Sequence, residues 1–367
     1  MYPSLAMDFL IGFKSVIEAP DCLVPAPQLY IESIGNASND APIWVAEKLI
    51  LQNNIDLAIS FCSFLKLEEM VRGFNSYRKP LIHLDMGGNI LKKSEHYSPY
   101  VIHHTLNAWQ SAYASGVYAA EKFGKKAAMI SSYYDGGYHL SSGIFAGYTA
   151  SGGEMVFNYV APMDYKSETY EGMINGLSEA KPDVIFSLFS YKESEKVFDV
   201  LSQSALNGNV PFITTGFMTD EKMHAKDYQL DDVYSVASWS FDDDNAAMQE
   251  FISTYKNTYN EQPNIMSLLG YETGQLVLEL IDEYGNIPAN IGDVIQDKTI
   301  NTPRGEIIFN DINESLAKEQ KIRKFDFNQI TYHNAVIDHI DLTDSKNLHE
   351  MFVDLPYSGW FNPYICT

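Results

Sequence analysis

The chain has 367 residues, about the length of two ordinary domains. Its composition, 46% hydrophobic and 20% charged, is typical of a soluble globular protein, and no apolar run reaches the roughly 18 residues of a transmembrane helix. The 25 basic and 48 acidic residues give a net charge of −23. Such a surface repels phosphate backbones and anionic lipid, so nucleic-acid and membrane-surface partners are not expected.

The chain contains three cysteines, Cys22, Cys62 and Cys366. They fit no metal or redox spacing, although two of them could form a disulfide. The first residues, "MYPSLAMDFL", lack the basic region and the longer apolar region of a signal peptide. The chain is therefore interpreted either as cytoplasmic or as exported with its signal removed.

The first part of the chain, to about residue 104, predicts a parallel sheet covered by helices, because apolar runs of strand type alternate with helical patterns. The expected helices cover residues 43–52 and the stretch through Met70 and Phe74. The expected strands are "QLYIES", "DLAISF", "KPLIHLD" and the strand-like run "YVIHHT".

A second, similar series follows. A helix is expected from Trp109, with apolar residues on one stripe, and further helices near Ile144, over residues 170–179 and over residues 193–204. The strands between them are "AAMISS", "EMVFNYV", "PDVIFSLF" and "VPFITTG". These units are too many for one open sheet. The sequence therefore predicts an α/β fold of two doubly wound parallel-sheet lobes.

Ligands of open parallel sheets bind beyond the carboxyl ends of the strands, so the turns that follow the strands are the candidate site. These turns contain aromatic rings, glycines and hydroxyl groups. Their only basic residues are Lys66 and Lys192. Two lobes that face each other with these edges would form one cleft suited to a small molecule. The turns are "SFCSFLK", "LDMGGN", "SSYYDGGYH", "LFSYKE" and "TTGFMTD".

Signatures of catalysis and of cofactor binding are missing from these turns. The adjacent Gly136 and Gly137 match neither GxxxxGK[ST] nor GxGxxG, and they indicate only a sharp turn. His103 and His104 would point to opposite faces of a strand, which disfavours a shared metal ion. Residues 242–244 indicate an acidic helix start rather than a calcium loop. No catalytic residue, metal or cofactor is therefore expected.

The order and spacing of several segments resemble the type I periplasmic binding proteins, specifically the branched-chain amino-acid (Leu/Ile/Val) binding proteins of ABC transporters. The resemblance extends to about residue 311, and residues 312–367 are expected to form strands and a tail on the second lobe. The segments that carry it are "YPSLAMDFLIGFKSVIEA", "AEKLILQNNIDLAISF", "KPLIHLDMGGN", "GKKAAMISSYYDGGYHLSSGIFAGYTASGGEMV", "AKPDVIFSLFSYKESEKVF", "FISTYKNTYNEQPNIMSLLGYETGQLV" and "TPRGEIIFND".

The resemblance implies two lobes that close on a ligand by hinge motion. The chain would cross between them three times, near residues 104–107, 236–240 and 303–307. The first lobe would then comprise residues 1–104 plus 241–305. The second lobe would comprise residues 105–240 plus 306–367.

The resemblance also implies the ligand-binding residues. Tyr138 matches a ring that lines the family's cleft, and Tyr191 lies at or next to a second one. The turn with Ser63 and Phe64 is where the family holds its ligand's carboxylate. For the aromatic residues, ordinary core or hinge packing stays open as the alternative. The predicted set is Tyr2, Ser63, Phe64, Met86, Gly87, Trp109, Tyr134, Tyr138, Tyr191, Phe217 and Trp239.

One departure from the family concerns the ligand. Gly216 and Phe217 occupy the turn that supplies the acid holding the ligand's ammonium group, and Gly87 and Gly88 occupy the turn that supplies a threonine hydroxyl. A buried ammonium without a carboxylate costs about several kcal/mol, so an α-amino acid is disfavoured. The aromatic residues of the predicted set suggest a flat or apolar solute that stacks between rings.

A second departure concerns the start of the chain. Family members open with a strand that is central in the first sheet, whereas this sequence begins at the equivalent of the following turn, "MYPSL". Omitting that strand would expose ladder groups and core side chains. We expect either residues before Met1 or a replacement strand.

The leading functional interpretation is a non-catalytic, periplasmic or cell-surface solute receptor. Its partners would be a small-molecule ligand and an ABC permease, and it would be a monomer. One option is a lipid anchor on a cysteine that this sequence lacks together with the signal. A ligand-sensing part of a signalling receptor uses the same fold and is the first alternative. An α/β enzyme such as a nucleotide-sugar transferase is the second, although it would need a basic or metal-bound phosphate site at one of the turns. A repressor-type regulator is least expected, because no DNA-binding helices precede the lobes.

Overall fold

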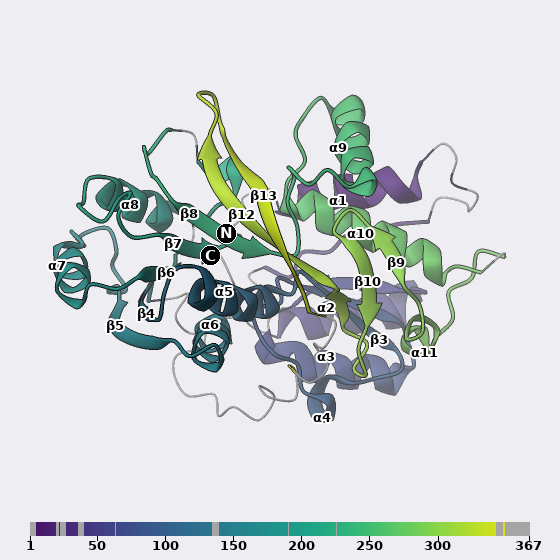
Figure 1. Cartoon of the computed structure of the whole chain (residues 1–367). Helices are drawn as coiled ribbons and strands as arrows, with labels where there is room; N and C mark the ends of the chain where they lie inside the picture. The colour runs from purple at the N-terminus through teal and green to yellow at the C-terminus, as the bar shows by residue number, and fades with distance from the viewer. Residues whose placement is uncertain are drawn as a thin grey trace.

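A computed structural model describes residues 5–19, 22, 27–35, 40–62, 64–133, 139–189, 191–224, 226–282, 284–342 and 348, without the side chains of residues 191 and 223. The chain forms two lobes, each built around a sheet with parallel strands. In Figure 1 the larger sheet and helices α5–α8 lie on the left, and helices α9–α11 lie on the right.

The first lobe contains a parallel sheet in the order β1-β2-β3. Neighbouring strand residues pack on opposite faces: Leu81 and Val101 join the cluster of α2 and α3, whereas Ile82 and Ile102 join that of α1 and α10. The elements are α1 (Leu5–Ile17), α2 (Ala41–Asn53), β1 (Ala58–Phe61), α3 (Phe64–Tyr77), β2 (Leu81–Asp85), α4 (Lys93–His96), β3 (Val101–Thr105), α9 (Ala246–Tyr259), α10 (Ile265–Leu280) and α11 (Ile291–Ile295).

The second lobe contains a seven-stranded sheet in the order β13-β12-β8-β7-β6-β4-β5. Strands β4–β8 are parallel, and β12 and β13 extend the sheet as an antiparallel pair. The elements are α5 (Ala108–Lys122), β4 (Lys126–Ser131), α6 (His139–Ala150), β5 (Glu154–Val160), α7 (Glu171–Ala180), β6 (Val184–Leu188), α8 (Tyr191–Ser202), β7 (Phe212–Thr215), η2 (Glu221–Met223), β8 (Val233–Ala237), β12 (Glu319–Phe327) and β13 (Tyr332–Asp341).

The two faces of the larger sheet are covered by different helices. Ala127 of β4 belongs to the core cluster that includes residues of α5 and α6, whereas Ala128 and Ile130 belong to the cluster with α7 and α8. This alternation explains why the parallel strands appear in the sequence as nearly continuous apolar runs. The α/β fold of two parallel-sheet lobes, predicted from those runs, is confirmed.

A small antiparallel sheet lies beside the first lobe, in the order β11-β10-β9. An isolated bridge joins His103 of β3 to Glu314, next to β11. The predicted third crossover, near residues 303–307, falls in the β9–β10 hairpin, and the chain enters the larger sheet at Glu319. The strands are β9 (Ile300–Thr302), β10 (Gly305–Phe309) and β11 (Ser315–Ala317).

The strand predicted for "QLYIES" is wrong, because residues 28–33 adopt no regular secondary structure. Leu29 packs partly against the core, but Ile31 is 65% exposed. Among the described residues, no replacement strand pairs with the outer edge of β1, and β1 pairs with β2 on its other side. The short apolar run of residues 29–31 therefore does not form a strand by itself, although the outer edge of β1 has no described partner.

Helices α5 and α6 approach each other closely at glycines. A Cβ atom on Gly147 would lie 2.1 Å from the carbonyl oxygen of Tyr113, and one on Gly116 would lie 2.3 Å from that of Ile144. Larger residues would push the helices apart, since such contacts leave no room for a side chain. This close packing fixes the amino-terminal ends of both helices at the carboxyl edge of the larger sheet.

Candidate functional site

A cavity opens at the carboxyl edge of the larger sheet, between α5, α6 and the ends of β7 and β8. The empty space between its lining atoms, which includes open solvent, is about 330 Å³. Among the described residues that line the cavity, no side chain carries a charge. These residues are Ala108, Ser111, Ala112, Ser115, Leu140, Ile144, Thr214, Thr215, Gly216, Phe217, Val236 and Trp239.

Two rings form one wall of the cavity. Phe217 and Trp239 are both buried, and their ring centroids are 5.7 Å apart. Phe217 follows β7 and Trp239 follows β8, and because these strands are parallel neighbours their carboxyl ends lie side by side. Two rings from adjacent turns are therefore placed at one edge, where a flat or apolar solute can pack against them.

Hydroxyl groups supply the polar part of the lining. Ser111 donates to Oε1 of Gln320 at 2.5 Å, Ser115 donates to the carbonyl oxygen of Ala112 at 2.7 Å, and Thr214 donates to that of Thr215 at 3.0 Å. Since these hydroxyl protons are engaged within the protein, the oxygens retain lone pairs. They can accept a hydrogen bond from a ligand.

A buried arginine lies behind the ring wall. Arg323 of β12 donates to the hydroxyl of Ser235 from Nε at 3.1 Å and to that of Thr219 from Nη2 at 3.2 Å. Its guanidinium centre lies 5.2 Å from the ring centroid of Trp239. Arg323 is not among the residues predicted from the sequence, because it belongs to no turn that follows a parallel strand.

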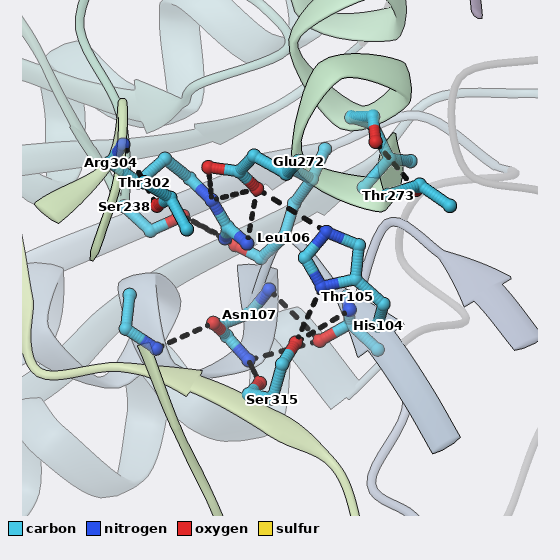
Figure 2. Close-up of polar contacts among 12 residues, drawn as sticks. His104, Thr105, Leu106, Asn107, Ser238, Glu272, Thr273, Thr302, Arg304 and Ser315 are labelled. Atoms are coloured by element: carbon cyan, nitrogen blue, oxygen red, sulfur yellow. Dashed lines mark hydrogen bonds and ion pairs between the residues drawn. The ribbon is translucent and has the colours of Figure 1, made fainter. Parts of the chain in front are cut away.

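A buried network of polar side chains, here called the hinge network, lies where the chain passes between the lobes (Figure 2). Its centre is Glu272 of α10, whose carboxylate accepts from Nε of Arg304 at 2.8 Å and is paired with Nη2 of Arg304 at 2.8 Å. The ring of His104, at the end of β3, lies 3.3 Å from the same carboxylate. Both Glu272 and Arg304 are 1% exposed.

The hinge network connects the three interlobe regions. Arg304 donates from Nη1 to the hydroxyl of Ser238 at 3.0 Å, and Ser238 donates to the carbonyl oxygen of Leu106 at 2.8 Å (Figure 2). Lys321 of β12 donates to the carbonyl oxygen of Arg304 at 3.1 Å and pairs with Asp243 at 3.1 Å. A rotation of the lobes must therefore preserve or rearrange these bonds.

The buried charges of Glu272 and Arg304 compensate each other, and each group affects the pKa values of its neighbours. Burial alone would raise the pKa of Glu272, but Arg304 and His104 lower it to about 2. Burial lowers the pKa of His104, and Glu272 opposes that effect in part. Glu272 is therefore a carboxylate at neutral pH, and its negative charge balances that of Arg304.

The structure brings together part of the predicted ligand-binding set. Phe217 and Trp239 line one cavity with Gly216. Trp109, on α5, is buried but does not line that cavity, and it packs against Ile90 and Leu348. The ring of Phe64, at the start of α3, is 5.3 Å from that of His96 in the first lobe. Four members, Tyr2, Ser63, Tyr134 and Tyr138, lie outside the described residues, as does the side chain of Tyr191.

The turn with Met86 and Gly87 follows β2 in the first lobe and is hydrogen-bonded to the start of α5. Gly87 has φ 74°, and its carbonyl oxygen accepts from the backbone N–H of Trp109 at 2.7 Å. Burial raises the pKa of the neighbouring Asp85 to about 6, although the N–H groups of Gly87 and Met86 oppose it. Three residues further along the chain, the N–H of Ile90 donates to Nδ1 of His139 in the second lobe at 3.1 Å. The turn thus contacts both lobes.

Within the described ranges, no group of three His, Cys, Asp or Glu residues could hold a metal ion. Cys22 and Cys62 are free thiols, and burial raises the pKa of Cys62. The third cysteine, Cys366, lies outside the described residues. No described helix has the length and apolar character needed to span a membrane.

The sequence profile of a family described as "Periplasmic binding protein" matches residues 38–323. A search of curated proteins gives no match. The profile therefore covers the first-lobe sheet, most of the larger sheet, the cavity and the hinge network.

Solved structures similar to the chain include a solute binding protein of an ABC transporter from Rhodopseudomonas palustris BisB5 in complex with 3,4-dihydroxy benzoic acid. It is 20% identical, covers 92% of this chain and 93% of its own, and has a TM-score of 0.74. Another, from R. palustris in complex with benzoate, is 18% identical, covers 91% and 92%, and has a TM-score of 0.72. The branched-chain amino acid transporter substrate binding protein LivJ from Streptococcus pneumoniae, in complex with isoleucine, is 15% identical, covers 91% and 95%, and has a TM-score of 0.68. These likenesses establish a shared fold.

Proposed function

Since the chain belongs to the periplasmic binding protein family, we propose that it is an extracytoplasmic solute receptor of an ABC importer. It binds a small, ring-bearing or apolar solute at the carboxyl edge of the second lobe, closes on it by hinge motion and delivers it unchanged to a permease. A signal sequence would have directed its export.

The observation that carries this proposal is the cavity with uncharged walls beside a hinge. Phe217 and Trp239 supply flat apolar surface, and the hydroxyl groups of Ser111 and Ser115 supply acceptors for a ring substituent. The hinge network lies next to this wall, because Trp239 follows Ser238 directly. Two fold relatives hold benzoates and one holds isoleucine, which makes both ligand types the natural probes.

The ligand is proposed to be a solute other than a branched-chain amino acid. The described residues that line the cavity offer no carboxylate to an ammonium group, and a buried ammonium without a counter-charge is strongly disfavoured. General acid–base catalysis requires a titratable group within reach of the substrate. The described residues that line the cavity supply none, which agrees with a receptor rather than an enzyme.

A thermal-shift panel tests this proposal. Benzoate, 4-hydroxybenzoate, phenylalanine, leucine, valine and glucose would each be added to the purified chain. A ligand that binds only the folded protein stabilises it by about 2.7 kcal/mol when present at about 100 times its dissociation constant. We expect the benzoates to raise the melting temperature and leucine and valine to leave it unchanged, with the bound compound recovered intact by chromatography.

Two results would count against the proposal. A melting temperature that rises with leucine or valine and not with any aromatic compound would reassign the ligand. Steady conversion of a bound compound to product would identify an enzyme instead of a receptor.

A further inference from the structure

The loop between β2 and α4 reaches from the first lobe to the second. The N–H of Ile90 in this loop donates to Nδ1 of His139, the first residue of α6, at 3.1 Å. Ile90 is 3% exposed and belongs to an apolar cluster with Trp109 of α5 and Leu348, and Ala146 of α6 packs against this cluster. A backbone group and a side chain of one first-lobe residue therefore both contact helices of the second lobe.

The residues that follow anchor the same loop to the first lobe. Leu91 is 2% exposed and belongs to the cluster of α2 and α3, which includes Leu67. The N–H of Lys92 donates to Nδ1 of His96 on α4 at 2.8 Å. Because Leu91 packs inside the first lobe, Ile90 cannot follow the second lobe when the lobes rotate apart, and its contacts with that lobe must break.

On the second lobe, the contact partner belongs to a rigid unit. Helix α6 is held against α5 at Gly147, where a Cβ atom would lie 2.1 Å from the carbonyl oxygen of Tyr113. His139 is 49 residues from Ile90 along the chain, and neither residue lies in a predicted crossover. The contact between the lobes therefore depends on how the lobes are oriented and is not imposed by a short chain connection.

The ring of His139 accepts the hydrogen bond as a neutral imidazole. Since the donor is a backbone N–H, Nδ1 presents its lone pair and the ring proton is on Nε2. Burial lowers the pKa of His139, and the charge of Lys92 lowers it further. The ring is therefore able to accept this bond at neutral pH.

We propose that the contacts of Ile90 with His139 and the α5–α6 cluster form an interlobe latch, which raises the closed fraction of the protein before a ligand binds. Rotation of the lobes apart would expose the apolar side chain of Ile90 to water. The apparent dissociation constant of a ligand is divided by the fraction of protein in the binding-competent state, so the latch would also tighten the binding of a solute held between the lobes. Only this effect on affinity rests on the proposed function.

Small-angle X-ray scattering of the ligand-free protein tests the latch with Ile90→Ala, which removes most of the apolar contact and keeps the N–H. We expect a larger radius of gyration than that of the wild type, a return to the wild-type value with saturating benzoate, and benzoate binding weakened about fivefold or more. Ile330→Ala is the matched control, because Ile330 is 85% exposed between β12 and β13, and it should change neither quantity. An unchanged ligand-free radius in Ile90→Ala, or undiminished benzoate affinity, would overturn the proposal.

Two substitutions of His139 test the hydrogen bond itself. His139→Phe keeps a ring and removes the acceptor, whereas His139→Asn offers an amide oxygen near the position of Nδ1. We expect His139→Phe to enlarge the ligand-free radius of gyration and His139→Asn to stay close to the wild type. If the two variants give the same radius, the hydrogen bond does not hold the lobes together and the proposal fails. Urea unfolding would establish that each variant is folded, and if Ile90→Ala does not fold, the His139 pair decides the question.

The ligand-free measurement distinguishes this inference from the proposed function. Larger radii in Ile90→Ala and His139→Phe, with no binding of any solute in the thermal-shift panel, would support the latch and contradict the proposed receptor. Unchanged radii in both variants, with benzoate bound as in the wild type, would end the latch and leave the receptor function standing.

Discussion

Replacing Glu272 by glutamine is expected to lower the free energy of unfolding by about 3–5 kcal/mol. The side chain of Glu272 is fully buried, and its carboxylate is the counter-charge of Arg304 at 2.8 Å. Without it, the guanidinium charge of Arg304 stays buried and uncompensated, which costs far more than the pair itself contributes. Urea unfolding monitored by circular dichroism measures the change.

A matched control lies on the same helix. Glu279 pairs with Lys298 at 2.9 Å, but its side chain is 49% exposed. Glu279→Gln should therefore change the free energy of unfolding by less than about 1 kcal/mol. Equal effects of the two substitutions would show that the buried charge pair contributes no more than an exposed one.

The same pair predicts a pH dependence. The pKa of Glu272 is about 2 in the folded protein and 4.5 in its ordinary state, so the folded state binds this proton less tightly than the unfolded state does. Its contribution to stability is therefore present above pH 4.5 and is lost as the pH falls from 4.5 through 2. The difference in stability between the wild type and Glu272→Gln should shrink across that window, whereas a constant difference would contradict the assignment.

Replacing Ala112 by leucine is expected to weaken benzoate binding at least about 100-fold, which corresponds to about 2.7 kcal/mol. Ala112 lines the cavity from α5, so three additional carbon atoms would occupy the space proposed for the ligand ring. Ala112 is 6% exposed and belongs to the hydrophobic core, so the larger side chain should also lower the free energy of unfolding, by about 1–3 kcal/mol. Titration calorimetry and urea unfolding measure the two effects.

Ala150→Leu is the matched control for this substitution. Ala150 is exposed at the end of α6, the neighbouring helix, and does not line the cavity. It should bind benzoate like the wild type. Undiminished binding by Ala112→Leu would place the ligand elsewhere.

The arrangement of strands and helices could largely be predicted from the sequence, because a strand buried on both faces requires a continuous apolar run. Strand β6 is buried along its whole length and β2 along all but its last residue, and most of their residues are apolar. "QLYIES" has a similar pattern but forms no strand. A strand also requires side-chain packing against the sheet and its covering helices, and the local sequence does not encode whether that packing forms.

The site could be predicted only in part, for a similar reason. Phe217 and Trp239 follow strands directly, so the rule that ligands bind beyond the carboxyl ends of parallel strands indicates them. Arg323 reaches the same wall from β12, which pairs antiparallel with β8 after a long connection. Likewise, Glu272 and Arg304 are 32 residues apart and meet only through tertiary packing. Contacts between distant segments have no local signature.

The most direct test of the central claim, that this chain closes around a small solute, is small-angle X-ray scattering with and without benzoate at a saturating concentration. Two lobes that rotate about the hinge network to enclose the solute should give a smaller radius of gyration in its presence. Titration calorimetry under the same conditions would establish saturation. A radius of gyration that stays constant while the protein is saturated would contradict closure on the ligand.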